Sequence, residues 1–297
     1  TDPLRIRHEL EKAVFIARSG RPGPVLLDIP DDVQRMEIDP DRLEPFAVPV
    51  SRSESNLSGV VGQCLDMIKA SLRPICILGW GIHCAKADRS AIEWVTQLGI
   101  PLAPTWAAAD IVSHDHQLFA GTFGTHGTRH GNFAVQNADL VISIGSRLDT
   151  KATGSPPSSF ARGARKIVVD VDPSELVKFE HFGVRLDLPI VADAREFLDE
   201  ANRGSRGLNL SSRFMPWLDK IHSWKKTYPA CVTSYYEQED INPYVFVKEL
   251  SKQTPGNAMV FTDTGCAVAW MLQAFEVREG QRLFHDFNNT AMGWALP

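Results

Sequence analysis

Two glycines close an apolar run in the first third of the chain. Gly79 and Gly81 end the stretch Pro74–Gly81 and precede a region with helical periodicity. In open α/β sheets, ligands bind at the carboxyl ends of strands, where glycine allows close approach and helix N-termini offer N–H groups. The two glycines are therefore candidates for a phosphate or nucleotide contact, although the same spacing also forms an ordinary tight turn.

A second apolar run, Ala138–Ser146, leads into charged residues. Gly145, Arg147 and Asp149 lie at or just after its end. A guanidinium group at a strand end can hold a phosphate through two parallel hydrogen bonds, or it can form a plain salt bridge. The sequence leaves both interpretations of Arg147 open.

A third run, Lys166–Asp172, ends in two acidic residues. Asp170 and Asp172 are placed where a carboxylate can accept hydrogen bonds from ribose hydroxyls. Asp172 is equally suited to cap a helix, because Asp-Pro-Ser-Glu is a good helix start. Together, the three strand ends favour a nucleotide site more than any one of them does.

The segment Gly121–Gly131 is rich in glycine and contains Gly124, His126 and His130. Such a loop is expected to be held close to another surface, and His126 is either a ligand contact or ordinary polar surface. No third residue stands at metal-ligand spacing, so no metal is assigned. The motifs of serine hydrolases, P-loop enzymes and zinc proteases do not occur.

The elements that must position these residues alternate between strands and helices. Near-continuous apolar runs indicate strands that are buried on both faces, and amphipathic stretches between them indicate covering helices. The fold class predicted is α/β, with a parallel-sheet, Rossmann-like central domain. Strands are expected at Pro24–Pro30, Pro74–Gly81, Ala138–Ser146, Lys166–Asp172 and Ala258–Gly265, and helices at Leu4–Arg18, Leu57–Ala70, Lys86–Leu98 and Pro243–Lys252.

Two polar segments without a clear period divide the chain into parts. The predicted division is an N-terminal piece (1–35), a linker (36–55), a central domain (56–203), a second linker (204–242) and a C-terminal piece (243–297). Neither end piece has enough elements to bury a core by itself, so we expect both to be parts of larger domains.

Composition excludes several classes of function. A net charge of −5 without basic blocks gives no reason to expect nucleic-acid binding, and no apolar run has the length of a membrane span. Five scattered cysteines without metal or disulfide spacing fit a reducing compartment. The expected location is cytoplasmic, unless a targeting segment was removed.

At these motifs the sequence resembles thiamine-diphosphate-dependent enzymes of the acetolactate synthase-like family. Ala13–Gln34 resembles the end of their pyrimidine-binding domain. The middle domain is matched by motifs from Gly99 to Asp172, and the opening of the diphosphate-binding domain by Thr262–Gly265 and Ala291–Pro297. Some details are similar to the acetolactate synthase-like proteins of bacterial surface-sugar pathways.

The resemblance implies a carboligase or lyase that decarboxylates a pyruvate-type 2-oxo acid and transfers the product to an acceptor carbonyl. Gly265, Cys266 and Ala267 match the turn that meets the cofactor diphosphate, a suitable place for an anion. Met292 matches the apolar residue beneath the bent cofactor, although an ordinary core methionine is the alternative.

Relatives that carry FAD hold it in the middle domain, where it is structural. The matching positions are Gly79, Gly81, Thr105, Gly124, His126, Gly145, Arg147, Asp149, Asp170, Asp172 and Asp193. Three departures weaken the match: Trp80 stands where a third glycine is usual, Trp106 replaces a smaller residue, and Lys151 replaces an arginine.

The family's activating glutamate and its Mg²⁺ ligands are expected outside this chain, which should be inactive alone. The intact protein is expected to be a homodimer or homotetramer. Two other functions stay open: a non-catalytic module that binds FAD or another nucleotide, and an electron-transfer flavoprotein.

Overall fold

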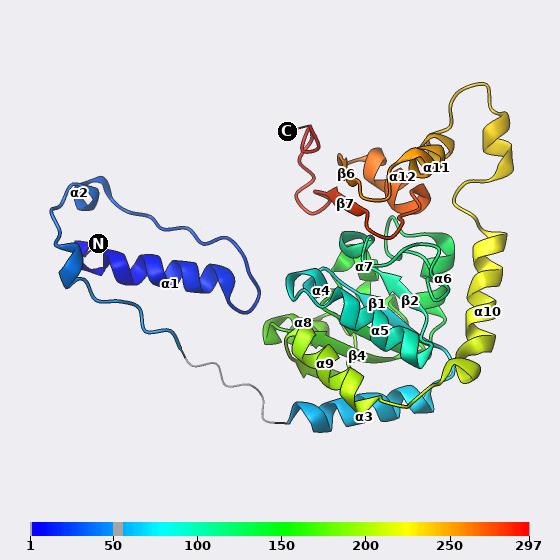
Figure 1. The fold of residues 1–297 in the computed structure, drawn as a ribbon, viewed down its shortest axis with the longest axis horizontal. Helices are drawn as coiled ribbons and strands as arrows, with labels where there is room; N and C mark the ends of the chain where they lie inside the picture. Colours follow the sequence, from blue (N-terminus) through cyan, green and yellow to red (C-terminus); the bar gives the residue numbers. More distant parts are fainter. Residues whose placement is uncertain (1, 50–55, 297) are drawn as a thin grey trace. The chain divides into compact units, whose positions relative to one another are not determined.

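The computed structural model describes residues 2–49 and 56–296 (Figure 1). The chain forms two compact units, residues 1–55 and residues 56–297. In the first unit the elements are η1 (Pro3–Arg5), α1 (Ile6–Arg18), α2 (Asp31–Gln34) and η2 (Pro40–Arg42). The predicted linker 36–55 lies partly outside the described residues.

The second unit contains all the strands that the structure describes. These are β1 (Pro74–Leu78), β2 (Leu102–Pro104), β3 (Leu140–Ile144), β4 (Arg165–Asp170), β5 (Leu188–Val191), β6 (Met259–Thr262) and β7 (Arg282–His285). Its α-helices are α3 (Leu57–Ala70), α4 (Gly81–Cys84), α5 (Asp88–Leu98), α6 (Arg129–Gln136), α7 (Thr150–Thr153), α8 (Pro173–His181), α9 (Ala194–Gly204), α10 (Ser211–Thr227), α11 (Pro243–Gln253) and α12 (Cys266–Ala274). The 3₁₀ helices are η3 (Trp106–Ala108), η4 (Pro157–Ser159) and η5 (Thr233–Glu237).

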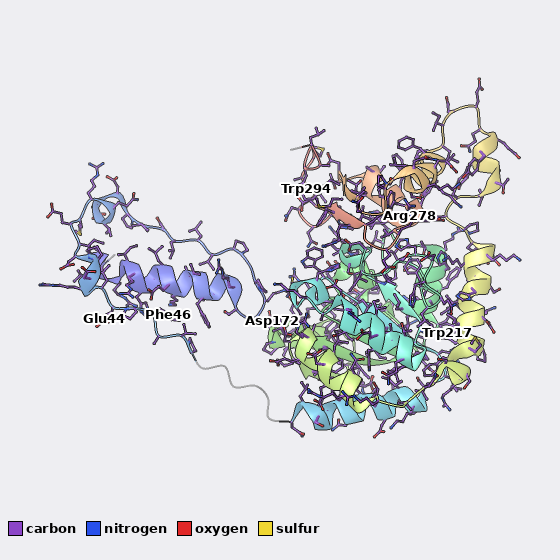
Figure 2. The ribbon with its side chains drawn as sticks, in the orientation of Figure 1. Glu44, Phe46, Asp172, Trp217, Arg278 and Trp294 are labelled. Carbon is purple, nitrogen blue, oxygen red and sulfur yellow. The ribbon has the colours of Figure 1, made fainter. Side chains whose placement is uncertain are left out.

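The N-terminal unit is held together by a few contacts of α1. Phe46 packs against Phe15 and His8, with ring centroids 5.5 Å and 5.3 Å away, and its N–H donates to the Glu11 carboxylate at 2.7 Å (Figure 2). The strand expected at Pro24–Pro30 is wrong: this segment is extended but pairs with no strand, and Leu26 is 85% exposed. A parallel strand needs neighbours for its N–H and C=O groups, and the described part of this unit supplies none.

A parallel five-stranded sheet forms the centre of the second unit, in the order β2-β1-β3-β4-β5. Alternate residues of each strand enter two different cores. In β1, Cys76 and Leu78 pack into one core, and Ile75 and Ile77 pack into the other. This explains why the run has no polar alternation, and it confirms the predicted α/β, Rossmann-like fold.

Helices cover both faces of this sheet (Figure 1). The first core contains residues of α3, α5 and α9, with Trp94 and Phe197 in edge-to-face contact at 6.1 Å. The second core contains residues of α6, α8 and α10. Two layers of helices around a parallel sheet are the arrangement expected of a doubly wound domain.

The prediction of a linker at 204–242 is wrong for residues 211–227, which form α10. Its buried residues Phe214, Trp217, Leu218 and Ile221 follow the i, i+3, i+4, i+7 spacing of one helix face. The Trp217 Nε1 group donates to the Pro74 carbonyl at 3.0 Å (Figure 2). The adjacent Gly/Ser/Asn-rich segment and Pro216 obscured this pattern. We therefore call residues 56–227 the central domain.

Residues 243–296, called here the C-terminal segment, contain a smaller α/β arrangement. Strands β6 and β7 pair in parallel, and Leu283 of β7 packs with Val268 and Phe275 in a separate core. Met259 and Phe261 of β6 stay 69% and 52% exposed. This two-stranded sheet has an apolar face that the described residues do not cover.

One buried carboxylate joins the central domain to the C-terminal segment. The Asp110 side chain is 0% exposed and accepts hydrogen bonds from Arg282 Nε at 2.6 Å and the Leu283 N–H at 3.0 Å. The His83 ring, on α4, contacts the same carboxylate at 3.0 Å. Burial raises the pKa of Asp110, but these partners outweigh it and the pKa is lowered.

We predict that Asp110→Asn destabilises the protein by about 2–3 kcal/mol, less than the roughly 3–5 kcal/mol for a fully buried pair, because the Arg282 side chain is 40% exposed. A lowered folded-state pKa means that Asp110 stabilises the fold above its unfolded pKa of about 3.9 and loses this effect as pH falls through the folded value. Urea unfolding at pH 7 and at decreasing pH measures both effects.

The matched control is Asp66→Asn, because the Asp66 side chain is 78% exposed in a surface pair with Lys69. Its stability should change by less than about 0.5 kcal/mol. Equal losses in the two variants would contradict a special role for Asp110.

Candidate cofactor sites

The sheet order brings the predicted strand-end residues of the central domain to one edge. All five strands are parallel, so their carboxyl ends lie side by side in the order of the sheet. The predicted residues lie along this edge in the same order. They are Thr105 after β2; Gly79 and Gly81 after β1; Gly145, Arg147 and Asp149 after β3; Asp170 and Asp172 at the end of β4; and Asp193 after β5.

Three of the glycines lie at the point where the strand order reverses, between β1 and β3. An added Cβ on Gly79 would stand 2.3 Å from the Gly145 carbonyl oxygen, and one on Gly81 would stand 2.8 Å from the Gly145 Cα. Gly145 also has a positive φ of +61°. These residues are glycines because the two turns pack on each other, and this requirement exists without any ligand.

The acidic residues at this edge cap helices. Asp149 accepts from the Ala152 N–H on α7 at 3.0 Å, Asp172 from the Ser174 N–H on α8 at 2.9 Å, and Asp193 from the Arg195 N–H on α9 at 2.8 Å. Asp170 is 6% exposed and accepts from the Asp172 N–H at 3.0 Å. The helix-cap interpretation of Asp172 is therefore confirmed, and capping does not exclude a second role in binding.

Arg147 forms the salt bridge that the sequence left open. Its Nε lies 3.1 Å from Glu175 on α8, while the side chain remains 60% exposed. The Glu175 side chain is only 12% exposed, and Lys178 pairs with it as well. Glu175 therefore keeps a cationic partner if the guanidinium group turns to a phosphate.

The turn after β2 and the glycine-rich loop meet the C-terminal segment. The Thr105 N–H donates to the Leu78 carbonyl at 2.9 Å, and Trp106 packs against Phe287 with ring centroids 4.9 Å apart. The His126 ring lies 4.8 Å from Phe287, and burial together with the Lys151 charge lowers its pKa.

Lys151 completes this contact. Its Nζ donates to the Phe287 carbonyl at 2.7 Å and lies 4.1 Å from the ring centroid. Gly124 supports the loop, because an added Cβ would stand 2.7 Å from the Lys151 carbonyl oxygen. Gly124, His126 and Lys151 therefore also support the contact between the central domain and the C-terminal segment.

Gly265, Cys266 and Ala267 form the start of α12. Gly265 has φ +74°, and an added Cβ would meet nothing within 4 Å. The first N–H groups of a helix have no acceptor within the helix, and Gly265 gives no side-chain cap. Unlike Gly79, Gly81 and Gly145, Gly265 has open space beside its Cα, and both Gly265 and Cys266 are exposed. An anion can therefore approach this helix N-terminus.

Met292 lies close to this turn. Asp263, at the end of β6, accepts from the Gly293 N–H at 2.8 Å through one oxygen and from the Thr264 N–H at 2.8 Å through the other. The Met292 side chain is 91% exposed, so it fills no core within the described residues. The core-methionine alternative does not hold for the described part of the chain.

The Asp110 contacts could not be predicted from sequence, because Asp110 and Arg282 are 172 positions apart and neither belongs to a motif. Within residues 2–49 and 56–296, no group of three or more His, Cys, Asp or Glu side chains is arranged to hold a metal ion. In the same residues, no helix is long and apolar enough to cross a membrane.

Comparison with known proteins identifies the class first. Residues 61–201 match the family model described as "Thiamine pyrophosphate enzyme, central domain". This range covers the whole five-stranded sheet, the helices from α4 to α8 and most of α3 and α9. The fold and the strand-end turns are therefore those of a thiamine pyrophosphate enzyme.

Curated relatives then narrow the family. The chain is 30% identical to a probable acetolactate synthase large subunit of Methanococcus aeolicus, over 97% of this chain and 50% of the relative. It is 31% identical to the acetolactate synthase large subunit of Corynebacterium glutamicum, over 100% and 47%. A chloroplastic acetolactate synthase of Zea mays is 29% identical, over 97% and 44%.

The chain belongs to the acetolactate synthase-like family of thiamine pyrophosphate enzymes. It spans about half the length of the curated relatives that it matches.

Proposed function

We propose that this chain supplies the central domain and the diphosphate-facing turn of a thiamine-diphosphate-dependent 2-oxo-acid decarboxylase and carboligase. The observation that carries this proposal is the start of α12, where Gly265 is exposed, has open space beside it and gives the helix no side-chain cap. The family relationship supports the proposal, because the curated relatives of this chain are named acetolactate synthases.

The residues at this turn fit a diphosphate. A helix N-terminus carries a partial positive charge of about half a unit, and its unpaired N–H groups point toward an anion. Cys266 is exposed and Ala267 is small, so neither side chain blocks the approach. When bound, thiamine diphosphate supplies the electron sink for decarboxylation. The residues of this chain hold its anionic end and limit where it can lie.

Met292 is proposed to support the cofactor rings from below. Asp263 fixes the neighbouring Gly293 backbone, so the exposed thioether is held near the turn that binds the diphosphate. A flexible, polarisable side chain can fill the irregular space beside two rings. The activating glutamate and the Mg²⁺ ligands would come from parts of the protein outside this chain.

The proposal extends to the substrates and the assembly of the protein. The donor would be a small pyruvate-type 2-oxo acid, and the acceptor a carbonyl compound, including those of sugar pathways. The protein would act in the cytoplasm as a homodimer or homotetramer, without nucleic-acid or membrane partners.

FAD on the central domain is a second, separable proposal. Its support is the reversal of strand order between β1 and β3, where open α/β sheets bind nucleotides. Arg147 is exposed enough to reach a phosphate, and Asp193 uses only Oδ1 to cap α9, which leaves Oδ2 for a ribose hydroxyl. A central domain that bound FAD without any thiamine chemistry would instead be the non-catalytic module.

The experiment that tests the enzymatic proposal is release of carbon dioxide by the full-length protein. With thiamine diphosphate, Mg²⁺ and pyruvate, we expect release that depends on all three components and stops when thiamine diphosphate is omitted. No release with pyruvate or with several larger 2-oxo acids would contradict the proposal. Reduction of bound FAD by a redox partner during turnover would instead support an electron-transfer flavoprotein.

A second prediction concerns Met292. Met292→Ala should lower kcat by at least about tenfold, because positioning lost at a reacting centre is costly, while the free energy of unfolding changes by less than about 0.5 kcal/mol. The matched control is Met259→Ala, which removes another exposed methionine of the C-terminal segment. Equal effects of the two substitutions on kcat would remove Met292 from the site.

A further inference from the structure

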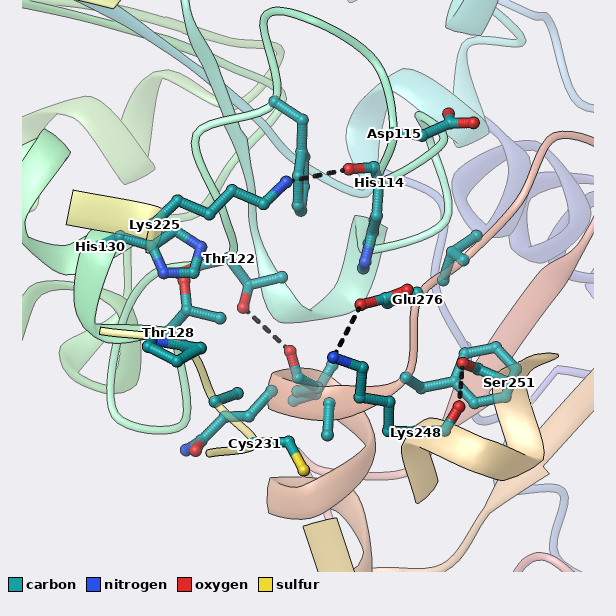
Figure 3. A pocket seen from close by; sticks show the side chains of 18 of the residues that line it. His114, Asp115, Thr122, Thr128, His130, Lys225, Cys231, Lys248, Ser251 and Glu276 are labelled. Atoms are coloured by element: carbon teal, nitrogen blue, oxygen red, sulfur yellow. Dashed lines mark hydrogen bonds and ion pairs between the residues drawn. The ribbon is translucent and has the colours of Figure 1, made fainter. Parts of the chain in front are cut away.

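A cavity of about 620 Å³ lies between the central domain and the C-terminal segment (Figure 3). Its walls come from residues 114–130 and the end of α10 on one side, and from α11, the end of α12 and residues 275–278 on the other. This volume lies within the range of about 300–1,000 Å³ that small-molecule sites occupy. The cavity lies at the opposite end of α12 from Gly265.

Cationic side chains outnumber acidic ones around the cavity. Lys225, Lys248, Lys252 and Arg278 line it, against Asp115 and Glu276. Lys252 is already paired with Glu249 at 2.6 Å. Lys248 reaches Glu276 only at 3.9 Å, the outer limit of an ion pair, so this contact is easily replaced.

Lys225 has no carboxylate partner within 4 Å among the described residues. Its ammonium donates to the His114 carbonyl at 3.2 Å and lies 5.3 Å from the Phe119 ring centroid (Figure 3). The residue as a whole is exposed. Partial desolvation of the ammonium nevertheless lowers the pKa of Lys225, while the charges of Glu276 and Asp115 act to raise it. An ammonium that is partly desolvated and lacks a counterion favours an anion beside it.

His130 provides the second, independent observation. The residue is 5% exposed, and its Nδ1 has no hydrogen-bond partner among the described residues. Burial and the Lys225 charge lower the pKa of His130 to about 4, against a smaller opposing effect of the Tyr228 backbone, so the ring is neutral at pH 7. A buried polar atom without a partner destabilises the fold, and a hydrogen bond to a ligand would offset that effect.

One effect opposes an anion in this cavity. The C-terminal end of α12 carries a partial negative charge of about half a unit, and Leu272 and Ala274 of that end line the cavity. The Leu272 carbonyl, however, already accepts from Thr122 Oγ1 at 3.0 Å. The lining has four cationic side chains against the two carboxylates of Asp115 and Glu276, and this excess outweighs the remaining carbonyls.

We propose that this cavity binds a small organic dianion with two carboxylate groups. Lys225, from α10, and Lys248, from α11, enter it from different elements and would each hold one carboxylate (Figure 3). His130 Nδ1 would form a hydrogen bond to the bound molecule. The proposal is independent of thiamine chemistry, because no residue of the α12 start takes part in it.

The test is a calorimetric titration of the full-length protein with succinate and with acetate at constant ionic strength. Succinate should bind saturably and at least tenfold more tightly than acetate, since only the dianion meets both lysines. Lys225→Gln and Lys248→Gln should each weaken succinate binding at least tenfold. The matched control, Lys226→Gln, removes the same charge from the next residue of α10, which does not line the cavity, and should bind like the unchanged protein.

Three results would overturn the proposal. The first is no saturable binding of succinate, including the case in which inorganic phosphate binds and succinate does not. The second is equal affinity for succinate and acetate. The third is equal weakening by Lys225→Gln and Lys226→Gln, which would indicate general surface charge. Circular dichroism checks that each variant is folded. If the Lys225→Gln variant does not fold, the Lys248→Gln variant decides the outcome.

Discussion

The buried carboxylate of Asp110 links the central domain to the C-terminal segment, which carries the turn proposed to meet the cofactor diphosphate. A side chain that is 0% exposed can keep its charge only when hydrogen bonds replace water, and Arg282, the Leu283 N–H and His83 provide them. Two of these partners belong to β7, and the third lies on α4, which starts at the packed glycine turn. The C-terminal segment, with Gly265 and Met292, is thereby fixed to the central domain.

Much of the central domain could be predicted from sequence. Strands β1, β3 and β6 lie within the predicted apolar runs, and β4 begins one residue before its run, because burial on both faces leaves a continuous apolar signal. No range was predicted for β2, β5 and β7, whose three or four residues are too few to show a clear period. The Pro24–Pro30 run has the composition of a strand, but no strand among the described residues pairs with it. Helix α10 was not predicted because a polar segment precedes it.

The candidate sites were predicted less completely, for a physical reason. Motifs place residues at strand ends, but they do not say what each side chain contacts. Gly79 and Gly145 are required by contact between two turns, and Asp149 and Asp193 cap helices. Gly265 differs, because its turn is open. Asp110, His130 and Lys225 belong to no local motif, and only the fold brings their environments together.

We propose that the start of α12 holds the cofactor diphosphate and that Met292 lies against the cofactor rings. A crystal structure of the full-length protein with thiamine diphosphate and Mg²⁺ tests this most directly. We expect diphosphate oxygens within hydrogen-bond distance, about 2.7–3.2 Å, of the Cys266 or Ala267 amide nitrogen, with the Met292 thioether against the cofactor. A diphosphate bound elsewhere, with Met292 still in solvent, would contradict it.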